Sequence, residues 1–195
     1  MKDFEDNEFP VACERLKSKR VRTARRMPVI PGFVSICFLL CPISSFSQKP
    51  TRHDQGELLG AVTAKTDLYP AAADAKNEIA EALTHAVVEK KRVMLIFGGN
   101  WCYDCHVLDR ALHEGAAGKI VSESFLLVHV DIGEGEKNPD LLKLYKIPLA
   151  KGVPAVAILT GKGKLIYSSG DGEFEAARRM MKKDLVAFLL SWKMK

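Results

Sequence analysis

Apolar and polar positions alternate along the last two thirds of the chain in a way that predicts alternating helices and strands. Between residues 71 and 91, apolar side chains recur three and four positions apart with charges between them, which predicts an amphipathic helix. The continuous apolar run at residues 93–97 ends in two glycines and predicts a buried strand, as does the run at residues 125–131. The apolar residues that recur at this spacing are Ala75, Ile79, Ala82, Leu83, Ala86 and Val87.

The remaining pattern completes an α/β arrangement. A helix is expected to begin near Cys102 and run toward Gly115 or Gly118. Further along, the pattern predicts a short helix at 140–145, a strand opening at Pro154, a tight turn at 161–163 and a returning strand at 164–168. A closing helix is expected at 175–192. Its predicted inward residues are Ala177, Met181, Leu185, Phe188, Leu189 and Trp192. Alternation followed by a hairpin predicts one mixed central sheet flanked by helices.

The N-terminal segment has the layout of a secretory signal. A cationic run at residues 14–26 precedes an apolar stretch, and small residues follow at Ser45 and Ser47, so we expect cleavage after Ser47. The alternative is a membrane anchor at residues 29–46, although prolines interrupt it and it is shorter than the roughly 20 residues of a spanning helix. The prediction is therefore a signal peptide at 1–47, a linker at 48–70 and one domain at 71–195.

Charge and cysteine placement narrow the function. The net charge of the whole chain is +5, but residues 1–47 hold 8 Lys and Arg against 5 Asp and Glu, so the rest is nearly balanced. The absence of a basic stripe argues against nucleic acid as a partner. Of the five cysteines, three lie before residue 48, which leaves only Cys102 and Cys105 in the predicted domain. Two cysteines are too few for a disulfide framework or a usual four-ligand zinc site, so we expect no metal and no cofactor.

Cys102 and Cys105 carry the candidate chemistry. Two cysteines three positions apart at the start of a helix lie on one face of its first turn, where their sulfur atoms can reach each other. At the helix N-terminus, unpaired N–H groups and the helix dipole favour an anion, so the pKa of the Cys102 thiol should fall below its ordinary value. Cys105 lies one turn inside and should stay protonated. This asymmetry predicts that Cys102 attacks a substrate disulfide and that Cys105 resolves the mixed disulfide.

The same residues resemble the thioredoxin superfamily. The match is W-C-x-x-C at 101–105, between a buried strand and a helix, together with Gly-Val-Pro at 152–154 before a later strand. The sequence around the two cysteines is similar to that of exported bacterial thioredoxin-like proteins. This resemblance implies a periplasmic thiol–disulfide oxidoreductase acting on cysteine-containing protein substrates. The resemblance also implies a cis bond before Pro154, a backbone offered to substrate by Val153, and a Trp101 side chain beside the dithiol.

The motif departs from the family in ways that bear on its redox direction. Ile96 stands where typical thioredoxins carry a buried aspartate. Asp104 is a candidate substitute, but its charge should instead oppose a second negative charge nearby and hold the pKa of the Cys102 thiol up. Together with Tyr103 and His106 it forms a set of modulating residues. We expect a reductant, which in an oxidising compartment needs a membrane electron donor; an oxidase or isomerase of the same fold is the alternative.

Three rival interpretations use the same residues. Residues 102–106 also match C-x-x-C-H, the attachment pattern of c-type haem, although we expect His106 to be a solvated helix residue. A zinc site would need His106, His113 and His129 to converge from a helix and a strand. A binding module that keeps the fold without turnover is the third, and Cys102→Ser would separate it from an enzyme by loss of disulfide reduction with binding retained.

Overall fold

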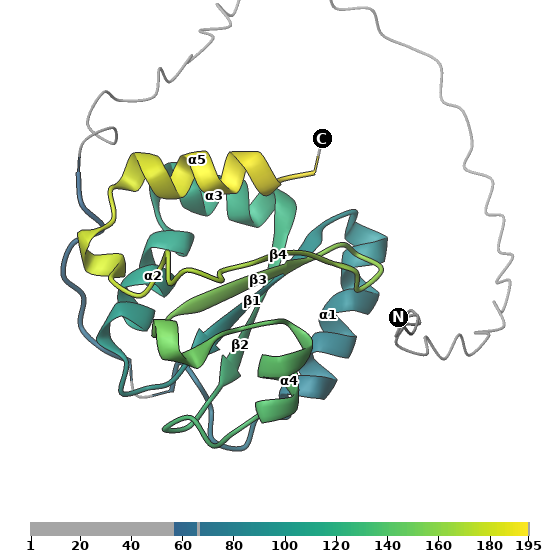
Figure 1. Cartoon of the computed structure of the whole chain (residues 1–195). Helices are drawn as coiled ribbons and strands as arrows, with labels where there is room; N and C mark the ends of the chain where they lie inside the picture. The colour runs from purple at the N-terminus through teal and green to yellow at the C-terminus, as the bar shows by residue number, and fades with distance from the viewer. Residues whose placement is uncertain (1–56, 66, 195) are drawn as a thin grey trace, which may run out of the picture. The chain divides into compact units, whose positions relative to one another are not determined.

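The computed structural model describes residues 57–65 and 67–194 (Figure 1). The predicted signal peptide and its alternative, the membrane anchor, lie outside these residues. Within the described part of the chain, no helix is both long enough and apolar enough to cross a membrane.

A mixed four-stranded sheet forms the centre of the fold, as predicted. The strand order is β2-β1-β3-β4. Strand β1 (Arg92–Gly98) runs parallel to β2 (Phe125–Asp131) and antiparallel to β3 (Ala155–Leu159), and β4 (Leu165–Ser168) returns antiparallel to β3. The central strand β1 is buried along almost its whole length, which explains its continuous apolar run.

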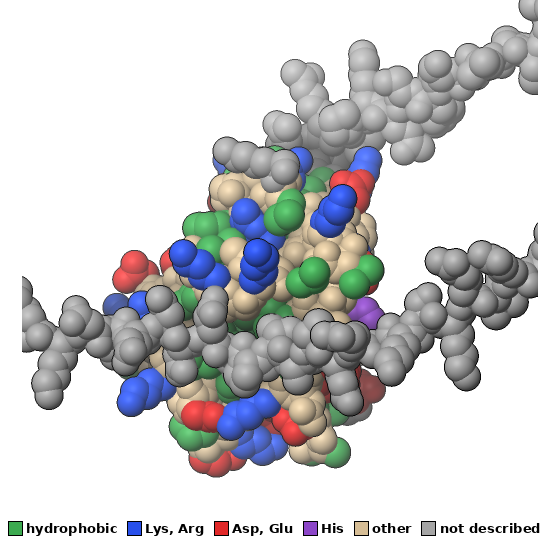
Figure 2. Space-filling model, turned by 90° about the vertical axis from the view of Figure 1, so that its right-hand side faces the viewer, with side chains coloured by type: hydrophobic (Ala, Val, Ile, Leu, Met, Phe, Trp, Pro, Cys, Tyr) green, Lys and Arg blue, Asp and Glu red, His purple; other side chains and the backbone are tan. Residues whose placement is uncertain are grey.

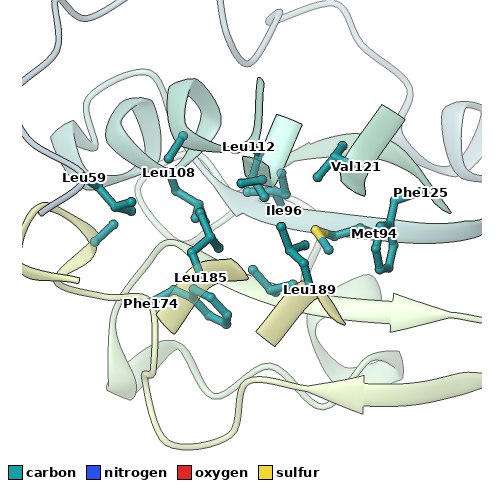
Figure 3. Packing of buried hydrophobic residues seen from close by; sticks show 14 of the residues in the cluster. Leu59, Met94, Ile96, Leu108, Leu112, Val121, Phe125, Phe174, Leu185 and Leu189 are labelled. Carbon is teal, nitrogen blue, oxygen red and sulfur yellow. The ribbon is translucent and has the colours of Figure 1, made fainter. Parts of the chain in front are cut away.

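Helices cover both faces of the sheet (Figure 1). The helices α1 and α4 pack against one face, while α2, α3 and α5 pack against the other. Their bounds are α1 Ala75–Glu89, α2 Tyr103–His113, α3 Gly115–Ser124, α4 Pro139–Leu144 and α5 Lys182–Trp192, with single 3-10 turns at η2 Leu149–Lys151 and η3 Ala177–Arg179. Figure 3 shows part of one of the two main core clusters, where side chains of α2, α3 and α5 meet those of β1.

The helix after Cys102 ends at His113, close to the predicted end at Gly115, because Glu114 is extended and Gly115 has a positive φ of 55°; the separate helix α3 that follows was not predicted. The prediction of the last helix needs correction. The closing helix begins at Lys182 rather than at 175, because Met181 is extended and forms an antiparallel bridge with Leu58. Its predicted inward positions Leu185 and Leu189 are nevertheless fully buried.

Helix α1 buries only some of the apolar residues whose spacing predicts it. Ala75, Ile79 and Ala86 are buried against the sheet, whereas Val87 is exposed. The helix buries a single narrow stripe, and Val87 follows Ala86 by one residue, which turns its side chain about 100° away. The spacing of the apolar residues alone does not decide whether Ala86 or Val87 faces the sheet.

Residues 57–65 and 67–70, here called the leading segment, are not a free linker. Leu59 is 2% exposed and belongs to the core shown in Figure 3, while Tyr69 is 1% exposed. The backbone of the segment is also paired: the Leu59 N–H donates to the Met180 carbonyl at 3.0 Å. The folded domain therefore begins before residue 71, earlier than the sequence pattern predicts.

Charged side chains are mixed on the surface. On the face seen in Figure 2, Lys and Arg side chains are interspersed with Asp and Glu side chains. This distribution agrees with the nearly balanced charge counted after residue 47.

Candidate dithiol site

Cys102 is the N-cap residue of α2, and a three-residue loop connects it to the end of β1. Its backbone is extended, and its Sγ accepts a hydrogen bond from the Cys105 N–H at 3.2 Å. The two residues are joined in a disulfide, with their Cα atoms 5.3 Å apart. A sulfur at this position faces the positive end of the helix dipole and accepts a hydrogen bond from an N–H group of the first helical turn, which favours a thiolate on Cys102 in the reduced state.

The two cysteines differ in their surroundings. Cys102 keeps 5% of its surface exposed and follows Trp101, which is 55% exposed, whereas Cys105 has no exposed surface. Both lie in a small cluster with Tyr69. Cys102 is therefore the more accessible of the two cysteines to an incoming thiol or disulfide.

Glycines allow the close packing around the dithiol. A Cβ atom on Gly98 would lie 2.5 Å from Cys105 Sγ and 2.6 Å from Tyr69 Oη, so only glycine fits there. A Cβ atom on Gly99 would meet Trp101 Nε1 at 2.6 Å. The Trp101 ring is held in this place because its Nε1–H donates to the Gly133 carbonyl at 2.7 Å.

The Gly-Val-Pro loop lies beside the dithiol, as the resemblance implies. The Val153–Pro154 peptide bond is cis, and the Val153 carbonyl oxygen lies 3.6 Å from Cys102 Sγ. Strand β3 begins directly after this loop and pairs with β1, and this pairing brings Cys102 and Val153, 51 positions apart, to the same end of the sheet.

Asp104 is neutralised by a cation that the sequence pattern did not reveal. Its carboxylate is 8% exposed and accepts hydrogen bonds from the Arg178 backbone N–H and from the Arg178 Nη1, both at 2.8 Å. The expected repulsion between Asp104 and a thiolate on Cys102 is therefore offset by a positive charge from the turn η3. Asp104 connects α2 to a distant part of the chain.

His106 is buried, which corrects the prediction of a solvated residue. Its Nδ1 accepts from the Lys65 N–H at 3.2 Å, and its Nε2 therefore carries the proton and donates to the Asn100 carbonyl at 2.9 Å. Both ring nitrogens are thus used by protein groups. Because a haem iron needs the free lone pair of an imidazole nitrogen, His106 does not fit the c-type haem interpretation.

Side chains of α2 and the preceding loop hold the leading segment against the site. Asn100 binds both backbone groups of Tyr69: its Oδ1 accepts from the Tyr69 N–H at 2.9 Å, and its Nδ2 donates to the Tyr69 carbonyl at 2.8 Å. The Tyr103 hydroxyl accepts from the Val62 N–H at 3.1 Å. The predicted modulating residue Tyr103 thus contacts the leading segment. Two apolar pairs in a polar stretch, at 58–59 and 68–69, were the available sequence signal.

An acidic residue one turn beyond Cys105 organises a second cluster. Asp109 is buried; desolvation alone would raise the pKa of its carboxyl, but contacts with His129 and Lys65 outweigh this and lower that pKa to about 2. The distances from its carboxylate are 2.9 Å to Lys65 Nζ and 3.2 Å to His129 Nε2. His113 Nδ1 also lies 3.4 Å from the Asp109 carboxylate, so both His113 and His129 contact this carboxylate.

At the position where typical thioredoxins carry a buried aspartate, this chain has an apolar core residue. Ile96 has no exposed surface and packs among the apolar residues shown in Figure 3. A buried polar group near Cys105 comes instead from Tyr69, which shares its cluster and which sequence reasoning missed. Burial raises the pKa of the Tyr69 hydroxyl, and the carboxylates of Asp109 and Asp131 raise it further.

Comparison with known proteins agrees with the fold and the dithiol. The family described as Thioredoxin-like matches residues 74–161. A disulphide isomerase from Xylella fastidiosa Temecula1 is 31% identical with a TM-score of 0.60, and the alignment covers 64% of this chain and 95% of that one. The reduced C-terminal domain of DsbD from Neisseria meningitidis is 19% identical with a TM-score of 0.46, covering 61% and 96% respectively. No protein with a curated description matches significantly.

The class follows from these observations. A mixed sheet with a close cysteine pair at the start of α2 and a cis-proline loop beside it is the fold of a thioredoxin-like disulfide oxidoreductase. The chain belongs to the thioredoxin-like family.

Proposed function

We propose that the protein is an exported thiol–disulfide oxidoreductase that reduces disulfides in cysteine-containing protein substrates, with Cys102 and Cys105 as its catalytic residues. The observation that carries this proposal is the place of Cys102 Sγ at the N-cap of α2, where it accepts the Cys105 N–H. This geometry lowers the thiol pKa and supplies a nucleophile near neutral pH.

The reaction proceeds by two exchanges. The Cys102 thiolate attacks one sulfur of a substrate disulfide, forms a mixed disulfide, and expels the other substrate sulfur as a thiolate. The Cys105 sulfur, after losing its proton, then attacks Cys102 Sγ and expels the second substrate thiolate. The substrate gains two electrons and two protons, and the protein is left with the Cys102–Cys105 disulfide seen in the structure.

Substrate binding is assigned to the surface beside Cys102. Val153 offers its backbone carbonyl 3.6 Å from Cys102 Sγ, and Pro154 follows it. The exposed ring of Trp101 provides an apolar wall on the same rim. An extended substrate segment would therefore lie along the 152–154 loop, with its disulfide presented to the less buried of the two cysteines.

The reductant direction is supported by the charge balance around Cys102. Arg178 is paired with Asp104, so the two charges largely cancel next to α2. The thiolate then has the helix N-terminus as its main stabilisation, because the nearby Arg178 is already engaged by Asp104, and this argues against a strongly oxidising disulfide. An isomerase is the second candidate, because the relative from Xylella fastidiosa is described as a disulphide isomerase.

Location and electron supply complete the proposal. The sequence layout before residue 48 is that of a secretory signal, and the bacterial periplasm is the expected destination; retention by residues 29–46 is the alternative. Since that compartment is oxidising, a membrane electron donor must return the dithiol to its reduced form. Cell fractionation with a C-terminal epitope tag would place the protein, and a purely cytoplasmic signal would contradict export.

Insulin reduction by dithiothreitol tests the enzymatic claim. The protein should accelerate precipitation of the insulin B chain at catalytic concentrations, and Cys102→Ser should abolish the acceleration. Cys105→Ser should trap a mixed disulfide that runs as a covalent adduct on a non-reducing gel. Refolding of scrambled ribonuclease measures isomerase activity in parallel. Equal insulin reduction by the protein and by Cys102→Ser would overturn the proposal.

A further inference from the structure

The hydroxyl of Tyr69 is a buried polar group without an assigned task. Its residue is 1% exposed, and Oη has no hydrogen-bond partner among the residues that the structure describes. Leaving a buried hydroxyl unbonded costs free energy, which phenylalanine at this position would avoid. The presence of the hydroxyl therefore calls for a state of the protein in which it is bonded.

The hydroxyl lies against the same face of Gly98 as the sulfur of Cys105. A Cβ atom built on Gly98 would be 2.6 Å from Tyr69 Oη and 2.5 Å from Cys105 Sγ. Tyr69, Cys102 and Cys105 form one buried cluster. The neighbours of Oη thus include Cys105 Sγ, which leaves as a thiolate when the disulfide is opened by attack on Cys102.

The ring of Tyr69 is fixed in this place from two sides. Asn100, two residues before Cys102, binds both the N–H and the carbonyl of Tyr69. The His129 ring packs edge-on against the Tyr69 ring, with centroids 5.3 Å apart and planes at 90°. A side chain held this firmly donates a hydrogen bond with little further loss of conformational entropy.

We propose that Tyr69 is a positioning residue which donates a hydrogen bond from Oη to the Cys105 sulfur once the disulfide opens, and thereby stabilises the reduced state of the dithiol. This inference rests on the proposed function, because it concerns the same redox cycle. It gives the site a polar group at the depth where Ile96 replaces the usual aspartate, and that group belongs to the leading segment.

The step in which the hydrogen bond forms is the reduction of the protein. A thiolate of an external thiol reductant attacks Cys102 Sγ, the Cys102–Cys105 bond breaks, and Cys105 leaves with the electron pair as a thiolate. The Tyr69 O–H donates to this thiolate. A second reductant thiolate then releases Cys102, and Cys105 takes a proton from solvent; the Tyr69 O–H goes on donating to the neutral Cys105 sulfur, so the hydrogen bond is kept in the reduced state.

Tyr69 keeps its own proton throughout this sequence. Burial, together with the carboxylates of Asp109 and Asp131, raises the pKa of the hydroxyl above its ordinary value. A phenol that does not ionise cannot act as the acid, so its contribution is the hydrogen bond alone. Bonds to charged acceptors are shorter and stronger than neutral ones, which is why the thiolate gains most from it.

The test is the equilibrium of the dithiol with glutathione in Tyr69→Phe, with Tyr167→Phe as a matched control on a remote strand. The full chain is equilibrated in glutathione buffers and alkylated, and redox state is read by mass spectrometry on the tryptic peptide 93–110, which holds both cysteines. Tyr69→Phe should shift the equilibrium about tenfold toward the disulfide, or about 30 mV more negative. Tyr167→Phe should remain within about twofold of the parent.

A second measurement separates this role from a general loss of stability. Urea midpoints of oxidised and reduced protein are compared for parent and Tyr69→Phe. Tyr69→Phe should lower the midpoint of the reduced form and leave that of the oxidised form unchanged or raised. Equal shifts in both forms, or an unchanged glutathione equilibrium, would overturn the role of Tyr69 alone. A parent dithiol that fails to exchange with glutathione would overturn the proposed function as well.

Discussion

Truncating Leu59 tests whether the leading segment is part of the folded domain. Leu59 is 2% exposed and packs in the core between α2 and α5, whereas its neighbour Leu58 is 48% exposed. Leu59→Ala removes the same atoms as Leu58→Ala from a very different environment. The adjacent control keeps residue type, chain position and helix propensity matched.

The expected loss of stability follows from burial. Leu→Ala at a core site costs about 2–5 kcal/mol, because the transfer energy of the side chain is lost and a cavity remains. At an exposed site the change should stay within about 0.5 kcal/mol. For a domain of this size a loss of about 3 kcal/mol corresponds to a melting temperature lower by roughly 10 °C.

Urea denaturation followed by far-ultraviolet circular dichroism measures both variants. Leu59→Ala should show a lower midpoint with an unchanged slope, and Leu58→Ala should overlay the parent. Equal midpoints for the two variants would refute the claim that the segment belongs to the core. A change confined to the denaturant slope of Leu59→Ala would refute the assumption of a single cooperative unit.

Three further predictions concern the dithiol and its surroundings. Gly98→Ala should cost about 1–3 kcal/mol of unfolding free energy, because its methyl would overlap Cys105 Sγ and Tyr69 Oη; Gly170→Ala, with open space around it, is the control, and equal stabilities would contradict the packing. Arg178→Met should raise the pKa of the Cys102 thiol by leaving Asp104 unpaired, measured as the pH dependence of iodoacetamide alkylation; an unchanged profile would contradict the charge balance. The Asp109 carboxyl has a folded-state pKa of about 2, below its unfolded value of about 3.9, so it contributes on the order of 2 kcal/mol above pH 4 that is lost as pH falls toward 2; Asp109→Asn should flatten this part of the stability–pH curve, and parallel curves would refute the assignment.

The elements and the dithiol were predictable because their signals are local. Apolar runs identify β1 and β2, and the spacing of Cys102 and Cys105 identifies the start of α2. The resemblance added the cis bond before Pro154, which no periodicity would reveal.

The contacts that modify the site were not predictable, because they join distant and irregular parts of the chain. Arg178 reaches Asp104 from a 3-10 turn 74 residues away, and nothing in the local sequence of either residue points to the other. Tyr69 lies in a stretch without periodicity, and the apolar pair at 68–69 does not by itself show that its side chain is buried beside the dithiol. His106 looked solvated because it follows the motif on a helix, but the leading segment covers it through Lys65.

The reduction potential of the Cys102–Cys105 pair tests the central claim most directly. It is measured by thiol labelling in defined redox buffers, with Cys102→Ser as the control that must lose the transition. A reductant supplied by an electron donor predicts a value near or below about −270 mV, the value typical of thioredoxin. A value near about −120 mV would contradict the account and make the protein a disulfide donor.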